Sequence, residues 1–201
     1  ENIKTQQGAA NAARAVLTQQ RETIARQYPR YADLITPPTP KPAQMRALLQ
    51  AGEALLVIYP GDGATLLWLI SADAKPQFAV AKLSRAELAQ RVSRLRALLD
   101  LGAAGGTAAP PEAALHALYR ELLGPLAAAL APVRSLLVAS DGALASLPLA
   151  SLVTQAPTAN SPTAWLVRQM AVTQLPSPSA LLALRRGPAP AAAAKAFMGF
   201  G

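Results

Sequence analysis

The chain has 201 residues, a formal net charge of +8 and no cysteine. Without cysteine, these residues can form no disulfide, no thiolate metal site and no cysteine nucleophile. No apolar run reaches the roughly 18 residues that a membrane span needs, so we expect no membrane partner. The length suits one α/β domain with a helical extension.

The positive charge is spread along the chain. Only Arg85, Arg91, Arg94 and Arg96 gather on one predicted helix, and no basic run is interleaved with aromatic residues. This pattern disfavours a nucleic-acid partner, although the pI of about 10.4 keeps that alternative open. Charged residues make up 15% of the chain, below the usual value of about 25%. We therefore expect part of its apolar surface to be covered by something outside these residues.

Residues 1–42 are predicted to form a helical connector and a proline-rich linker. Residues 8–28 carry a sparse apolar stripe, which predicts a helix that ends before Pro29. Residues 36–42 contain four prolines and predict a stiff, extended segment. The chain opens without methionine or an apolar leader, so we expect an excerpt of a longer protein whose targeting signal is out of view. The compartment is left open, with the cytoplasm favoured over secretion.

Residues 43–201 are predicted to form the N-terminal part of an α/β domain. A short helix over 43–50, with Met45 on its buried side, comes first. Turn-rich segments then separate three apolar runs, which predicts an antiparallel meander with strands at 54–59, 65–71 and 77–83. Neither a Lys-Ser/Thr pair nor a helix follows the Gly61-Asp62-Gly63 turn, which argues against a phosphate-binding loop.

Two amphipathic helices are predicted after the meander. Ser84 and Glu87 have the spacing of a capping box, and leucines at helical spacing follow them out to Asp100. The second helix runs from Glu112 to Leu123, and Gly124-Pro125 should kink or restart it before Leu130.

The stretch Ser135–Leu152 is predicted to organise the fold. Its run Leu136–Ala139 does not alternate with polar residues, which is typical of a strand buried on both faces, so Val138 should be inaccessible. Asp141-Gly142 then predicts a turn.

The C-terminal part should continue the same architecture. A polar loop over 154–163, a strand over 171–175 and a short helix over 180–186 are predicted. Lys195–Gly201 resembles a core strand that is just beginning. We expect its apolar side chains to meet another chain or another fragment of the same polypeptide. The alternative is that they fold back onto the sheet of this chain.

His116 is the sole histidine of the chain. It lies beside the apolar stripe of the second amphipathic helix, no other histidine or cysteine could complete a metal site, and no Gly-x-Ser-x-Gly motif is present. We interpret His116 as structural or solvated, and we predict no catalytic, cofactor-binding or metal-binding residue and no cofactor.

The order of these motifs resembles the N-terminal half of a CHAT domain, the caspase-like domain that occurs with tetratricopeptide repeats in bacteria. The resemblance runs from Leu48 to Gly201. Its ordered segments are residues 52–57, 68–71, the capped helix that begins at Ser84, and residues 118–126, 136–144, 147–152 and 175–182.

The resemblance implies an α/β sandwich related to caspases and separase, in which a cysteine nucleophile and a histidine base act. Both would lie downstream of the strand that begins at Lys195, and neither has a counterpart here. The chain alone should therefore be inactive. We expect it to be the non-catalytic portion of a cysteine endopeptidase, buttressing the active half and linking it to a repeat or regulatory region.

The expected partners are the protein or peptide substrate of the parent enzyme, the remainder of the same polypeptide, and repeat-domain or homo-oligomer contacts. Two alternatives stay open. One is a non-enzymatic scaffold or interaction module of a repeat protein. The other is a basic nucleic-acid-binding domain, whose affinity should fall steeply with salt.

Overall fold

The computed structural model describes residues 2–27, 40–103, 111–159 and 161–186, and it divides the chain into two compact units, residues 1–39 and 40–201. The first unit contains helix α1 (Asn2–Gln27), on which Val16 and Leu17 are exposed. This helix begins before Gly8, where the sequence predicted its start. Gly8 has open space around it, and one exposed glycine costs a helix only about 1 kcal/mol. Most of the predicted proline-rich linker lies outside the described residues.

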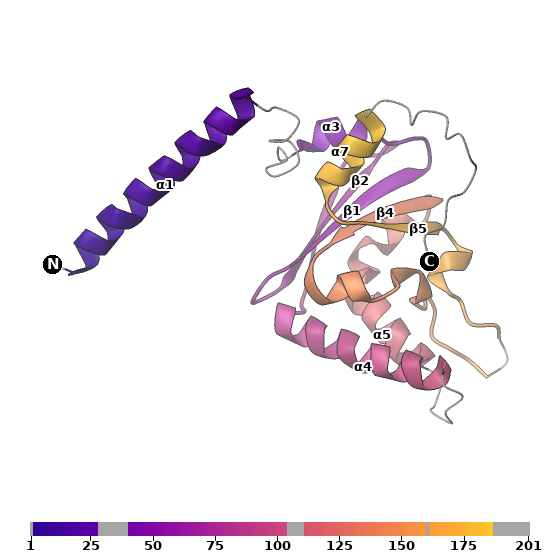
Figure 1. The fold of residues 1–201 in the computed structure, drawn as a ribbon. Coiled ribbons are helices and arrows are strands. Elements are labelled where there is room, and N and C mark those ends of the chain that lie inside the picture. The colour runs from indigo at the N-terminus through magenta and orange to yellow at the C-terminus, as the bar shows by residue number, and fades with distance from the viewer. Residues whose placement is uncertain (1, 28–39, 104–110, 160, 187–201) are drawn as a thin grey trace, which may run out of the picture. The chain divides into compact units, whose positions relative to one another are not determined.

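The second unit is built on a five-stranded sheet with the order β3-β2-β1-β4-β5 (Figure 1). Strands β1 (Glu53–Pro60), β2 (Thr65–Ser71) and β3 (Gln77–Ala81) form the predicted antiparallel meander. Strands β4 (Ser135–Ser140) and β5 (Ala171–Leu175) pair in parallel with β1 and with β4, respectively. The mixed α/β class is therefore confirmed, although β3 is two residues shorter than predicted.

Helices cover both faces of this sheet. Helices α3 (Pro42–Arg46) and α7 (Pro178–Arg186) pack on one face. Helices α4 (Arg85–Ala103), α5 (Glu112–Leu122) and α6 (Ala127–Leu130) pack on the other. The predicted break lies between α5 and α6, where Gly124–Leu126 forms a 3-10 turn around Pro125.

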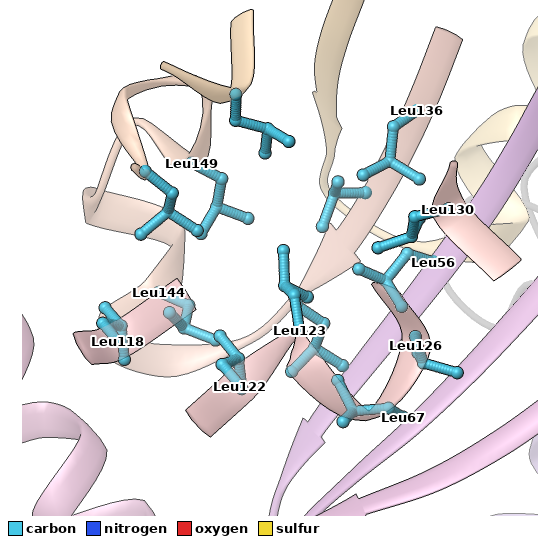
Figure 2. Packing of buried hydrophobic residues seen from close by; sticks show 14 of the residues in the cluster. Leu56, Leu67, Leu118, Leu122, Leu123, Leu126, Leu130, Leu136, Leu144 and Leu149 are labelled. Atoms are coloured by element: carbon cyan, nitrogen blue, oxygen red, sulfur yellow. The ribbon is translucent and has the colours of Figure 1, made fainter. Parts of the chain in front are cut away.

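The larger core lies between the sheet and α4, α5 and α6. Leu56 and Leu67 from the strands meet Leu118, Leu122 and Leu123 from the α5 region in this cluster, which Figure 2 shows from close by. Three 3-10 turns close it: Gly142–Ser146, Leu149–Ser151 and Leu166–Arg168. The core is almost wholly aliphatic, as a composition with 4% aromatic residues predicts.

Strand β4 has the position that the sequence predicted for it. It lies between β1 and β5, and Val138 is 0% exposed. Leu136 and Val138 face the larger core, whereas Leu137 and Ala139 face the smaller core beneath α3 and α7. An unbroken apolar run is what a strand covered on both faces requires.

The predicted capping box at the start of α4 is also formed. The backbone N–H of Glu87 donates to Ser84 Oγ at 3.3 Å, and the backbone N–H of Ser84 donates to Glu87 Oε2 at 2.8 Å. The hydrogen bonds that Ser84 donates from its side chain and backbone hold the pKa of Glu87 below its usual range. Two backbone donors at the helix start are thereby satisfied within the capping box.

Candidate functional site

The carboxyl ends of the parallel strands β1, β4 and β5 are the first place to look for a site, because open α/β sheets bind ligands at this edge. Pro60, Arg85, Asp141 and Gly142 line a cavity of about 30 Å³ there. A volume of this size holds only about two water molecules. This cavity is therefore too small to receive a peptide or a cofactor.

Asp141 has a local structural role at this edge. Its Oδ1 accepts a hydrogen bond from the backbone N–H of Gly142 at 2.6 Å, and Gly142 has a φ of 64°. This is the turn that Asp-Gly predicts, since glycine adopts a positive φ without strain. Arg85 Nε lies 3.8 Å from Asp62 Oδ1, and that pair is largely solvated.

His116 links α5 by a hydrogen bond to the segment that follows the 3-10 turn Leu149–Ser151. Its Nδ1 lies 3.0 Å from the carbonyl oxygen of Val153, so that nitrogen donates the hydrogen bond. Further along the same segment, Thr163 Oγ1 donates a hydrogen bond to Glu112 Oε1 of α5 at 3.3 Å. The imidazole is thus used to hold two pieces of backbone together. That no residue of this chain is catalytic stays a prediction.

An ion pair with several hydrogen bonds joins α7, near the C-terminus of the second unit, to the start of β1. Arg185 of α7 donates from Nη2 to both carboxylate oxygens of Glu53, at 2.9 and 3.1 Å, and from Nη1 to the Leu48 carbonyl oxygen at 3.2 Å. The backbone N–H of Gln50 also donates to Glu53, at 2.8 Å. Burial raises the pKa of Glu53, but these bonds favour the carboxylate and hold that pKa below its usual value. Residues so distant in sequence carry no local signal of their pairing, so the sequence analysis missed them.

An apolar surface remains open on the meander. The side chains of Tyr59, Trp68, Phe78 and Val80 lie on the face that α3 and α7 cover elsewhere, and these four residues, which we call the meander face, are exposed. The rings of Trp68 and Phe78 lie 5.4 Å apart between centroids. Phe78 and Val80 are two residues apart on β3 and therefore share a face of the sheet.

A groove between α4 and α5 is the second open feature. It has a volume of about 360 Å³, and its lining consists of Arg91, Arg94, Leu95, Leu98, Ala114, Ala117 and Leu118. One of the lining arginines, Arg91, forms an ion pair across the two helices. Its Nη1 lies 2.8 Å from Glu121 Oε1 of α5, because the two helices pack side by side.

Within the described ranges, no group of histidine, aspartate and glutamate side chains has a geometry that could hold a metal ion. Over the same ranges, no helix is both long enough and apolar enough to cross a bilayer.

Comparison with known protein families finds a match in the C-terminal part of the chain. Residues 112–200 match the CHAT domain family. The match begins where α5 begins, takes in β4, β5 and α7, and extends through most of the segment Lys195–Gly201, which lies outside the described residues. No curated protein matches the chain. The resemblance over residues 48–111 stays a prediction.

Proposed function

We propose that this chain is the non-catalytic portion of a CHAT-family, caspase-like cysteine endopeptidase. In this proposal it buttresses the catalytic part and links it to a regulatory region. The catalytic thiolate and the histidine base would come from polypeptide outside residues 1–201. This chain has no cysteine, and its one histidine is hydrogen-bonded to a backbone carbonyl.

The exposed meander face is the observation that supports a buttressing role. Phe78 and Tyr59 are 56% and 52% exposed beside Trp68 and Val80, on the same side of the sheet as the buried Leu55. Adjacent large apolar side chains left open on a protein surface usually mark a contact with another protein or domain. The proposed occupant is the catalytic part of the same polypeptide.

The experiment uses the full-length parent protein. We expect the double substitution Trp68→Ser/Phe78→Ser to lower endopeptidase activity on a casein substrate at least about tenfold while thermal unfolding changes little. The matched control is Val167→Ser, which changes an equally exposed valine away from the meander face. Equal activity in the double variant and the control would contradict the buttressing role.

A non-enzymatic scaffold is the second candidate, and the same exposed face favours it. A nucleophile-directed cysteine probe added to the full-length protein separates the two functions. The peptidase proposal expects labelling that one Cys→Ala substitution abolishes, whereas the scaffold expects no such labelling. The control is the chain of residues 1–201, which cannot be labelled because it contains no cysteine.

A further inference from the structure

We propose that the groove between α4 and α5 is a docking site for an acidic amphipathic helix of a partner protein. This inference does not depend on whether the parent protein is a peptidase. It rests on the spacing of the residues that line the groove, on their charge and on the shape that two alanines create.

The α4 side of the groove is one continuous helical stripe. Arg91, Arg94, Leu95 and Leu98 stand at positions i, i+3, i+4 and i+7, so their side chains share one face of the helix. From Arg91 to Leu98 the helix rises about 10 Å, which is close to two turns. A second helix lying along this stripe would meet it with the same spacing of anchor residues.

The α5 side of the groove has small side chains, which leave it open. Ala114, Ala117 and Leu118 repeat the spacing i, i+3 and i+4, and the two alanines leave room where larger residues would close the gap. Leu95 and Leu118 are buried and form the apolar floor. The volume of about 360 Å³ is within the range of natural ligand pockets.

The charge of the lining selects an acidic partner. Both charged residues that line the groove are arginines, and the Arg91–Glu121 pair joins the two helices beside it. Arg94 is exposed and has no ion-pair partner among the described residues. A leucine-rich helix with glutamates flanking its apolar stripe would fill the floor and place a carboxylate against Arg94.

The test measures binding of a fluorescein-labelled peptide to the whole chain of residues 1–201. The probe is a 16-residue helical peptide with leucines at i, i+4 and i+7 and glutamates on both flanks. We expect saturable binding that weakens as salt rises. Two comparison peptides, one with lysine in place of glutamate and one with a central proline, should bind much more weakly, because they lack the charge or the helix.

Paired variants locate the site. Arg94→Glu should weaken binding about tenfold, whereas Arg96→Glu, an equal charge change on an exposed residue of α4 outside the groove, should leave it nearly unchanged. Ala117→Leu should fill the groove and abolish binding, whereas Ala113→Leu, on the outer surface of α5, should not.

Several outcomes would overturn the proposal. They are absence of binding, equal binding of the lysine or proline peptide, and equal effects of Arg94→Glu and Arg96→Glu. Sedimentation of the chain without peptide tests the remaining occupant. Self-association that Ala117→Leu abolishes would assign the groove to a second copy of this chain instead.

Discussion

The two faces of the sheet are covered in different ways. One face is sealed by α4, α5, α6 and three 3-10 turns, and its central side chains are mainly buried leucines and valines. Among the described residues, α3 and α7 alone cover the other face, above β4, β5, the start of β1 and the end of β2. The rest of that face is the open meander face. The first face buries the larger apolar cluster and should therefore contribute more to stability, whereas the second leaves apolar side chains exposed.

Substitution of Leu67 should have the largest effect. Leu67 points from β2 into the larger core and is 0% exposed, so Leu67→Ala should lower the free energy of unfolding by about 2–5 kcal/mol in urea denaturation. Leu66→Ala, one residue earlier on the opposite face, should cost only about 1 kcal/mol because Leu66 is only half-buried. Similar losses at both positions would remove the contrast between the faces.

The next largest effect concerns the attachment of α7 to the less covered face. Glu53→Gln replaces the carboxylate that Arg185 and the Gln50 N–H contact, and it should cost about 1–2 kcal/mol at neutral pH. Because the folded state lowers the pKa of Glu53, this stabilisation is complete above pH 4.5, the usual glutamate pKa, and is lost as pH falls through the lower folded value.

Urea denaturation of the wild type and Glu53→Gln across pH values from about 3 to about 7 measures that dependence, and the two stability curves should converge at acid pH. Glu121→Gln is the control. Its pair with Arg91 is more exposed, so the loss should stay below about 0.5 kcal/mol. A constant gap between wild type and Glu53→Gln down to the acid end of that range would show that the carboxylate charge is not what holds α7.

A smaller loss is expected at the turn that leads from β4 into the 3-10 covering of the sealed face. Gly142 has a φ of 64°, and a Cβ at this position would meet no atom within 4 Å, so Gly142→Ala should cost about 1 kcal/mol through backbone strain alone. Gly63→Ala, equally free of neighbours but without a positive φ, should change stability by less than about 0.5 kcal/mol. Thermal unfolding of both variants gives the comparison.

The sequence predicted the sealed face well because local patterns determine it. The unbroken run Leu136–Ala139, the Ser84/Glu87 capping box and the leucine spacing after Glu112 each indicate burial or a helix start within a few residues. Their positions in the structure agree with those predictions. Element ends were less certain, as the early start of α1 and the early end of β3 show.

The less covered face and the groove could not be predicted, because both depend on which elements meet in space. The alternation in β2 and β3 indicates that Trp68 and Phe78 share a face, but not that α3 and α7 stop short of them. Likewise, the arginines of α4 give no sign that Arg91 meets Glu121 or that the alanines of α5 leave a groove beside Arg94.

The smallest effect is expected on the meander face. Phe78 is 56% exposed and touches Trp68, so Phe78→Ser should lower the free energy of unfolding by only about 0.5 kcal/mol, the contribution of one exposed ring pair. Because the substitution removes apolar surface, it should also reduce binding of the dye ANS by the chain of residues 1–201. Urea denaturation and dye fluorescence measure the two effects on one sample. A loss above about 2 kcal/mol would be typical of a buried aromatic residue, and it would mean that another part of the chain or a second copy covers this face in solution.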